Sequence, residues 1–493
     1  MKHLGALEQT SPIYVITVAS LAAASMVLNH PVSFAFGAFG ALLLVILAFR
    51  SHWLGLLAIF PLASSIRPTP PDIGAQEALF ALLVAVVVLK SIAEVAISTG
   101  WKTLLRQYGK PLGIACALAI VNLAVAISHG VGLADWLRGL VPFLFIGLFI
   151  PVAQAIEHHP ERLRWLGLSI GALIALLAGH VVIYYLANGL HHPYWVIEID
   201  GIPQRIPEAL ASLHADARGP FLDRVTISIQ NSTDVLLPVG TVAGLIVAAF
   251  ASDRRAAIFG YAVSILSLTA VIMTYTRSML LSAMLVLAIF MVYAALSRRG
   301  FTKVVGLVLG LALVGTGVIA ALNIESKWWS RMSLLTEAVK TDGAASSVIT
   351  RTDGASSVTT RLEEYGIAWN RFIEHPLLGN GLGAKHAIQF EGPQGLVMQH
   401  VAYIHNWPLY FLMATGVTGF LIYAWALLAP AFIRPQVTSH TTLMVLRGVI
   451  LTMAIYGLFF AVFRLITFNL LLAAVWGVAL AISRSSSGSS TFT

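Results

Sequence analysis

Charged side chains are scarce in this sequence of 493 residues, and cysteine is nearly absent. Asp, Glu, Lys and Arg make up 11% of the residues, whereas a soluble domain carries roughly 25%, and 58% of the residues are hydrophobic. Water cannot be the main solvent of such a chain, which excludes an ordinary soluble protein. Cys116 is the single cysteine, so an internal disulfide and a cysteine-based metal cage are excluded as well.

A secretory leader and a concentrated basic patch are also missing. The first ten residues lack the charged region, apolar core and cleavage site of a signal peptide, so we expect the first helix to be retained. The formal net charge is +8, but the basic residues are spread over many connectors instead of gathering on one face. This distribution argues against a nucleic-acid partner.

The sequence does contain many long apolar stretches. A helix that crosses a bilayer needs about 20 mostly apolar residues, and only helices or closed barrels satisfy backbone polar groups in lipid. Because the short alternating strands of a barrel are absent, the sequence predicts an all-α polytopic membrane protein with about 14 transmembrane helices and two long polar loops. The predicted spans are 12–29, 32–49, 52–66, 76–97, 111–129, 136–156, 163–188, 233–251, 256–274, 279–297, 302–323, 403–429, 441–462 and 466–483.

The connectors between these spans predict their orientation. Basic residues fall in alternate short connectors, which the positive-inside rule places in the cytoplasm. They are Lys102, Arg106, Lys110, Arg162, Arg164, Arg254, Arg255, Arg298, Arg299 and Lys303. We therefore expect a multi-pass protein of the bacterial inner membrane with cytoplasmic termini and periplasmic long loops.

That orientation divides the chain into six parts, and any chemistry is expected in the periplasmic ones. The parts are N-terminal helices that serve as scaffold and lipid entrance (1–188), a first periplasmic loop (189–232), central helices (233–323), a large periplasmic loop (324–402), C-terminal helices (403–483) and a cytoplasmic tail (484–493).

The large loop contains a predicted helix that begins at Arg361. Thr360 and Glu363 form a capping-box pattern at its start, and His375-Pro376 ends it. Its predicted apolar face consists of Leu362, Tyr365, Trp369 and Phe372. Residues 377–383 (LLGNGLG) then form a glycine-rich turn that lacks the Gly-Lys-Ser/Thr ending of a phosphate loop. Gly379 and Gly381 there permit either a close approach of the backbone to a ligand or a simple chain reversal.

Three motifs follow one another in this region: residues 361–369 (RLEEYGIAW), residues 375–383 (HPLLGNGLG), and His405-Asn406 followed by residues 416–419 (GVTG). Their order and spacing resemble the signature of the O-antigen ligase and O-antigen (exopolysaccharide) polymerase family.

Two further places extend the resemblance beyond these motifs. Thr276-Arg277-Ser278, in a short external turn, is similar to the family's arginine at the matching place, and Arg224 with Asn231 resembles its first external loop. Together the similar positions span roughly residues 220–430. The first 200 residues match only in being helical spans.

The resemblance implies a metal-independent membrane glycosyltransferase that needs no cofactor. Its donor would be a glycan carried by undecaprenyl diphosphate, and its acceptor a hydroxyl group at the periplasmic face. In a ligase the acceptor is lipid A core of lipopolysaccharide, and in a polymerase it is another lipid-linked repeat unit. The sequence leaves both acceptors open.

Arginine suits this chemistry, because a departing diphosphate gathers negative charge that fixed cations stabilise. Arg277 lies at the membrane surface by its place in an external turn. Arg361 starts its predicted helix, where the helix dipole disfavours a cation unless an anion binds there. With Arg224, these are the predicted diphosphate ligands. The alternatives are an interfacial arginine that reaches lipid phosphate, for Arg277, and an ion pair with Glu364, for Arg361.

His405 is the predicted general base, because a neutral imidazole can accept the proton of an attacking hydroxyl. Asn406, Trp369, Gly379 and Gly381 are predicted to support the site. The plain alternative for His405 is a capping or packing role. We expect no metal site, since His191-His192 lack ligands at a helical spacing.

A transporter or a lipid-linked glycan flippase is the alternative from another class. Such proteins place ionisable groups or broken helices at the bilayer midplane and often have internal repeats. The predicted spans are nearly free of charge and show no duplicated halves, which favours the enzyme.

Overall fold

Helices dominate the computed structural model, which describes residues 12–27, 31–66, 75–157, 159–186, 196–199, 202–205, 234–274, 276–297, 300–321, 353–392, 395–433 and 440–485. The helices before the first long loop are α2 (Pro12–Val27), α3 (Pro31–Arg50), α4 (His52–Ala63), α5 (Ala75–Thr99), α6 (Trp101–Ser128), α7 (Leu133–Leu144), η1 (Phe145–Leu148), α8 (Phe149–Glu157) and α9 (Arg162–Leu186). Those after it are α12 (Leu236–Phe250), α13 (Arg254–Met273), α14 (Arg277–Ser297), α15 (Phe301–Ala321), α17 (Asp353–Glu374), α18 (Trp407–Leu428), η3 (Ala429–Phe432), α19 (His440–Tyr456), η4 (Val462–Arg464) and α20 (Ile466–Ser485).

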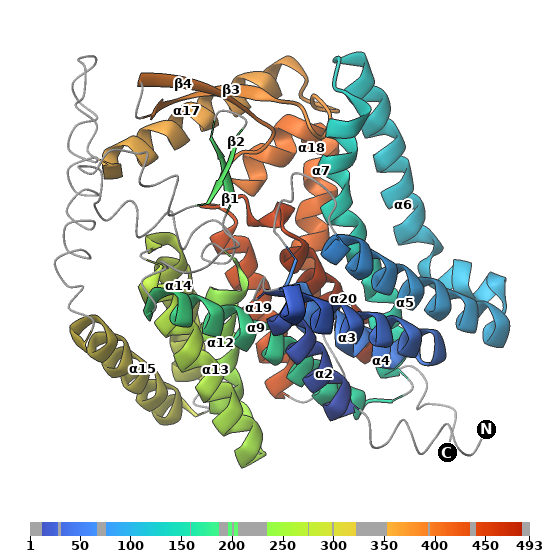
Figure 1. The fold of residues 1–493 in the computed structure, drawn as a ribbon, viewed down its shortest axis with the longest axis vertical. Coiled ribbons are helices and arrows are strands. Elements are labelled where there is room, and N and C mark those ends of the chain that lie inside the picture. The colour runs from blue at the N-terminus through green and yellow to red at the C-terminus, as the bar shows by residue number, and fades with distance from the viewer. Residues whose placement is uncertain are drawn as a thin grey trace.

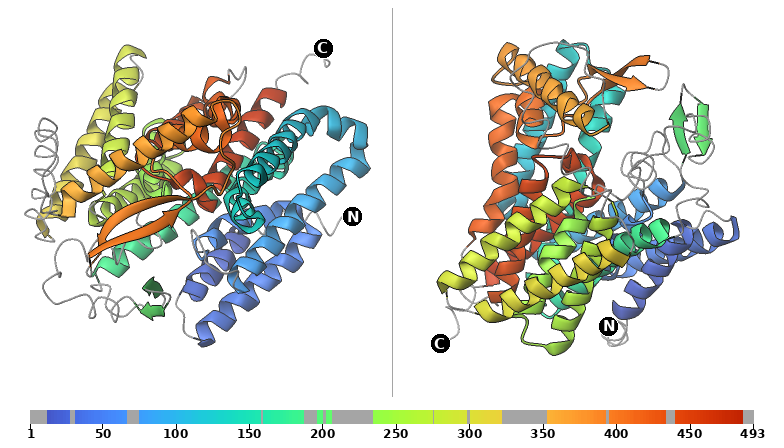
Figure 2. Two further views of the ribbon diagram at one scale, coloured as in Figure 1. Left: turned by 90° about the horizontal axis from the view of Figure 1, so that it is seen from above. Right: turned by 90° about the vertical axis from the view of Figure 1, so that its left-hand side faces the viewer.

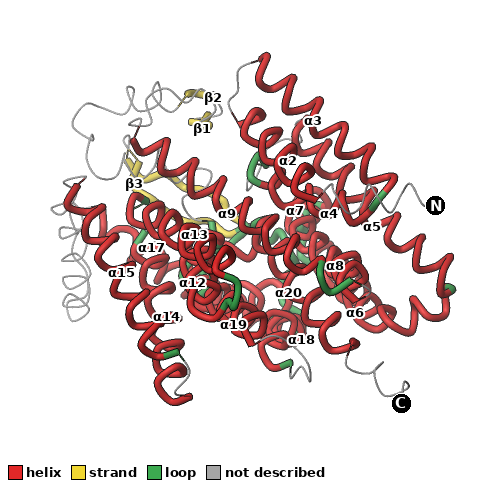
Figure 3. The backbone as a smooth tube through the Cα atoms, turned by 90° about the horizontal axis from the view of Figure 1, so that it is seen from below, coloured by secondary structure: helices red, strands yellow, loops and turns green. Residues whose placement is uncertain are grey.

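Strands form only two antiparallel hairpins among the described residues, as the view from below shows (Figure 3). The first pairs β1 (Val196–Ile199) with β2 (Ile202–Arg205). The second pairs β3 (His386–Gly392) with β4 (Gly395–Val401), with His386 opposite Val401. The fold is therefore the predicted all-α membrane architecture, with a β-hairpin added in each long loop.

Apolar helices coincide with all of the predicted spans. Ten of the described helices are long and apolar enough to cross a membrane. The other four predicted spans are apolar helices of 10–17 residues, namely Pro12–Met26, His52–Ala63, Leu236–Phe250 and His440–Tyr456. The number of crossings thus stays a prediction, whereas the positions of the apolar helices agree with it.

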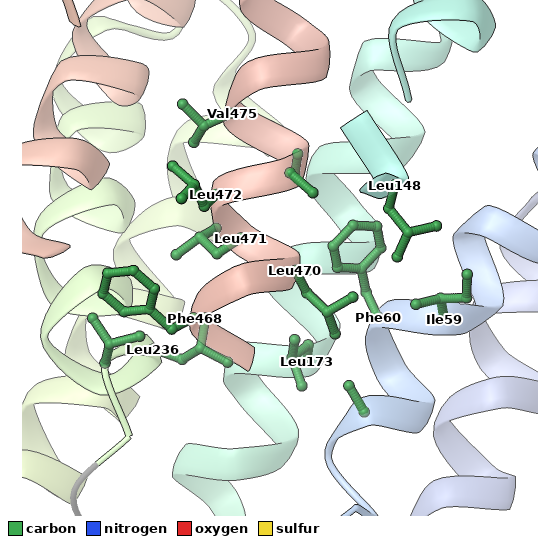
Figure 4. Packing of buried hydrophobic residues seen from close by; sticks show 14 of the residues in the cluster. Ile59, Phe60, Leu148, Leu173, Leu236, Phe468, Leu470, Leu471, Leu472 and Val475 are labelled. Atoms are coloured by element: carbon green, nitrogen blue, oxygen red, sulfur yellow. The ribbon is translucent and has the colours of Figure 1, made fainter. Parts of the chain in front are cut away.

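α20 packs against α8, η1 and α4, and its side chains share one buried apolar cluster with those of α9 and α12 at the centre of the bundle (Figure 4). Phe468, Leu470 and Leu472 of α20 have no exposed surface. α4 is buried along almost its whole length, which suits a helix that is apolar on every side. These contacts hold the helix bundle together. The bundle supports the motifs of the large loop at one of its ends, which we call the polar end.

α17 and the β3–β4 hairpin lie across this end of the bundle, over α18 and α7 (Figure 1). The view from above shows α17 running over the ends of the spanning helices (Figure 2). An amphipathic helix in this position covers the bundle without entering it. The polar motifs of the large loop are thereby brought to one place.

The structure corrects two details of the predicted helix in the large loop. α17 begins at Asp353, so Thr360 and Arg361 lie inside the helix and the capping-box prediction is wrong. Leu362 and Trp369 are 55% and 49% exposed, so these two members of the predicted apolar face are wrong, whereas Tyr365 and Phe372 are half-buried. Glu364 and Ala368 join Tyr365 on the inward side, because packing on the bundle selects the side that carries the buried carboxylate.

Candidate functional site

His405 and Glu364 form the centre of the polar end. Nδ1 of His405 lies 2.8 Å from Oε2 of Glu364, and the backbone N–H of His405 donates to the same oxygen at 3.3 Å. The Glu364 side chain is only 1% exposed, whereas that of His405 is 22% exposed. A buried carboxylate that accepts the Nδ1 proton leaves the lone pair on Nε2, and the partly open imidazole can meet a substrate.

Helix α18 and its cap hold the backbone of His405. Asn406 is the N-cap: its side chain accepts from the N–H of Leu409 at 3.0 Å and donates to the carbonyl of Leu458 at 3.2 Å. The hydroxyl of Tyr365 donates to the carbonyl of His405 at 3.2 Å. Partial burial raises the pKa of this phenol, which therefore stays a donor at neutral pH. Asn406 and Tyr365 thus hold the backbone that carries His405.

Two aromatic rings flank the imidazole, and an arginine lies over each ring. The rings of Tyr403 and Phe460 meet His405 edge to face, with centroids 5.2 and 5.5 Å away. Cζ of Arg361 lies 5.2 Å from the Phe460 centroid, and Cζ of Arg464 lies 5.5 Å from the Tyr403 centroid. We call these five residues the aromatic ladder. It places one guanidinium on each side of His405, the general-base candidate. The cation–π contact with a ring restricts the position of each guanidinium.

Arg464 is buried in part and leaves its Nε atom without a hydrogen-bond partner in the described part of the chain. Glu364 is engaged by His405, so it is not an ion-pair partner that neutralises Arg361. The ladder therefore presents two cations whose charge remains available to an anionic ligand.

The glycine-rich turn 377–383 forms hydrogen bonds with α18 at the point where that helix is broken. Gly416 has φ 64° and ψ −171° within that helix, which interrupts its hydrogen-bond ladder. The N–H groups of Asn380 and Gly381 donate to the carbonyls of Met413 and Ala414, both at 2.9 Å, and the N–H of Val417 donates to the carbonyl of Pro376 at 2.8 Å. The turn thus satisfies the groups that the break releases.

Close backbone packing explains why glycine occupies this turn. Gly379 and Gly381 have positive φ, and a Cβ at either would come within 2.5 Å of backbone atoms of Thr415 or Ala126. Asn122 of α6 completes the joint, because its side chain donates to Ala414 and accepts from Leu382 and from the indole of Trp136. Of the two interpretations left open by the sequence, the geometry favours a structural turn, in which the backbone approaches protein.

His386 is the other titratable group beside the pair. Its side chain is 2% exposed, and neither ring nitrogen has a partner among the described residues. Burial lowers its pKa to about 4, and the charges of Glu364, Arg371 and His405 act on it as well. His386 is therefore neutral at the pH at which His405 would act as a base.

The remaining predicted site residues lie elsewhere. Arg277 starts α14, half-buried next to the buried Thr276 and Met279. Trp369 faces outward on α17 and packs on Phe372, with ring centroids 5.4 Å apart. Arg224 lies outside the described residues. The structure thus brings Arg361, His405 and Asn406 together, and the roles of all the predicted site residues stay predictions.

No group of three or more His, Cys, Asp or Glu side chains suited to a metal ion occurs in the part of the chain that the structure describes.

Two residues of the arrangement escaped sequence reasoning. Glu364 stands three residues after Arg361, which pointed to an ion pair within the helix, but the helix turns it toward His405. Arg464 belongs to η4, in a short turn between two apolar helices. A single arginine in an external turn was the signal that singled out Arg277, and the same signal applied to residues 457–465 finds Arg464.

Comparison with known families gives one match. Residues 262–424 match the family model described as O-Antigen ligase. The matched segment contains Arg277, Arg361, Glu364, His405 and Asn406, and it ends before Arg464. No curated protein matches the chain.

Proposed function

Because residues 262–424 match the O-antigen ligase family model, we propose that this chain transfers a glycan from undecaprenyl diphosphate to an acceptor hydroxyl. The reaction takes place at the periplasmic face of the inner membrane and needs no metal ion. The observation that carries the proposal is the Glu364–His405 pair between two ladder arginines.

His405 acts as the general base. Nε2 accepts the proton of the acceptor hydroxyl while that oxygen attacks the anomeric carbon of the donor sugar. The bond from this carbon to the diphosphate oxygen breaks, and the diphosphate leaves with the electron pair. Glu364 keeps the imidazole in the required tautomer and stabilises the imidazolium that forms.

Arg361 and Arg464 hold the diphosphate. Negative charge grows on the leaving oxygen as the bond breaks, and preorganised guanidinium groups stabilise this charge more than that of the bound donor. Arginine stays charged throughout and can grip two phosphate oxygens at once. Arg277, at the start of α14, extends this set toward the membrane surface, where the lipid part of the donor lies. Arg224 stays a predicted diphosphate ligand on the sequence alone.

The acceptor divides the proposal into two forms. Lipid A core makes the protein an O-antigen ligase, and a second lipid-linked repeat unit makes it an O-antigen or exopolysaccharide polymerase. Both forms use the same base and the same cations, so the assay must offer both acceptors. Transport or flipping of the lipid-linked glycan without bond breakage is the outcome that would replace the enzyme.

The test is a transfer assay in vesicles that contain the undecaprenyl-diphosphate glycan and a metal chelator. Wild type is compared with four substitutions, His405→Gln, Glu364→Gln, Arg361→Lys and Arg464→Lys. We expect rate losses of at least about 100-fold for His405→Gln, at least about 10-fold for Glu364→Gln, and about 100-fold for each arginine variant.

Matched controls lie close to the site. His400 is exposed on β4, five residues before His405, and Glu363 is exposed on α17, one residue before Glu364. His400→Gln and Glu363→Gln should transfer at the wild-type rate. Full activity in folded His405→Gln would refute the assigned base, and absence of transfer to either acceptor by wild type would favour the transport alternative.

A further inference from the structure

A polar cavity of about 450 Å³ opens at the C-terminal end of α17. It lies between the turn that follows α6, the last turn of α17 and the end of the glycine-rich turn. Its lining includes His129, Asp135, Arg371, Glu374, Asn380 and Lys385. A cavity of this size falls within the range of small-ligand sites, which is about 300–1,000 Å³.

The charges of the cavity balance. Asp135 and Glu374 contribute two carboxylates, Arg371 and Lys385 contribute two cations, and Lys385 pairs with Asp135 at 2.9 Å. A diphosphate requires an excess of positive charge, which the ladder has and this cavity lacks. Balanced acceptors and donors instead suit a neutral ligand with many hydroxyl groups, each of which both donates and accepts.

Glu374 occupies a place that helix stability does not explain. It is the last residue of α17, where the helix dipole disfavours a carboxylate. Its side chain lines the cavity, where its oxygens can accept hydrogen bonds from ligand hydroxyl groups.

The cavity and the proposed base share one helix face. Arg371 follows Glu364 by seven residues on α17, which is about 10 Å along the helix axis. His386 lies next to Lys385 in sequence and is under the electrostatic influence of Arg371, Glu364 and His405. A sugar in the cavity would therefore belong to a glycan whose reacting end reaches His405.

We propose that this cavity binds a neutral sugar unit of one of the two glycan substrates and so positions that glycan for reaction. The proposal rests on the proposed function, because it takes the substrates from it. The donor glycan and the acceptor glycan offer the same hydroxyl chemistry, and kinetics with each varied in turn distinguishes them.

The first experiment measures steady-state transfer by Glu374→Ala and by the double variant Asp135→Ala/Lys385→Ala, which removes both partners of the ion pair. The KM for one glycan should rise at least about 10-fold while kcat changes little, as expected when binding is lost equally from ground state and transition state. Glu363→Ala, on the exposed side of α17, is the matched control and should keep both constants. Glu374→Gln keeps the shape of the side chain and should give a smaller rise.

A second experiment does not depend on transfer. The probe is the lipid-free glycan released by mild acid from the lipid-linked pool of the host cells, and its binding is followed by saturation-transfer NMR in nanodiscs. Wild type and His405→Gln should bind it equally, and the cavity variants should bind at least about 10-fold more weakly. Such a result supports the cavity even if the vesicle assay shows no transfer.

Two results would overturn the proposal. One is unchanged KM for both glycans together with unchanged probe binding in the folded cavity variants. The other is loss of inhibition by inorganic pyrophosphate in these variants with glycan binding intact, which would make the cavity part of the diphosphate site.

Discussion

At the scale of single residues, Asp234 shows how the fold acts on a carboxyl group. It precedes α12 and is 3% exposed. It accepts hydrogen bonds from the N–H of Leu236 at 2.9 Å and from the hydroxyl of Thr467 at 2.7 Å. Burial outweighs both bonds and raises its pKa to about 6. This carboxyl therefore links the starts of α12 and α20. When it ionises, the folded protein becomes less stable.

The raised pKa predicts that stability falls as pH rises from about 4 to about 6, because the folded protein then holds a proton that the unfolded chain has released. Asp234→Asn removes this effect, so it should be more stable than wild type by up to about 3 kcal/mol at about pH 8. The two proteins should converge below about pH 4. Thermal unfolding in nanodiscs across this range measures the difference. A constant difference at every pH would contradict the assignment.

At the scale of elements, the break in α18 depends on the glycine-rich turn. Gly381→Ala would place Cβ 2.5 Å from Cα of Ala126 at a residue with φ 92°. We expect a loss of at least about 2 kcal/mol, from backbone strain and the forced separation of the turn from α6. A lower unfolding temperature and a lower yield of folded protein would report it.

Gly366 provides the control for this prediction. It lies within α17, and a Cβ added there meets nothing within 4 Å. Gly366→Ala should leave stability unchanged or raise it by about 0.5–1 kcal/mol, as for any glycine in an open helix interior. Equal losses in Gly366→Ala and Gly381→Ala would show that the packing at Gly381 is not the cause.

The same helix shows why part of the site could be read from the sequence and part could not. His405 and Arg361 belong to motifs of fixed spacing, and the structure places them beside one another through Phe460. The inner face of α17 was predicted only in part. Counting apolar residues overlooks the buried Glu364, which pairs with His405, 41 positions away in the sequence. Side-chain partners so distant in sequence leave no periodic pattern.

At the scale of the whole molecule, orientation in the membrane is the prediction on which the proposed site depends. Glu363 is exposed on α17, and Lys303 is exposed near the start of α15, in one of the basic connectors. In a Cys116→Ser background, a membrane-impermeant maleimide should label Glu363→Cys in intact spheroplasts and Lys303→Cys only after lysis. Removing Cys116 matters because it is exposed.

The reverse labelling pattern would put the Glu364–His405 pair in the cytoplasm and would contradict the proposed periplasmic reaction. Labelling of both positions in intact spheroplasts would indicate leaky cells, and a cytoplasmic marker protein checks for this.

The positions of the apolar helices could be predicted because lipid dictates the length and composition of each span, so every apolar stretch carries its own signal. Loops carry no such signal. The β3–β4 hairpin was therefore not predicted. Arg464 could be recognised as part of the site only from the structure, in which the turn between α19 and α20 lies next to Tyr403.

The aromatic ladder also bears on the choice between transfer and hydrolysis. Water is the smallest and most abundant nucleophile near a membrane surface, and a base that activates a sugar hydroxyl can activate water equally well. The rings of Tyr403 and Phe460 flank the imidazole of His405 on two sides, and apart from the Tyr403 hydroxyl they offer water no strong hydrogen bond. In the proposed reaction, a glycan that fills the remaining opening would displace the last solvent from the base, so the donor would be preserved until an acceptor arrives.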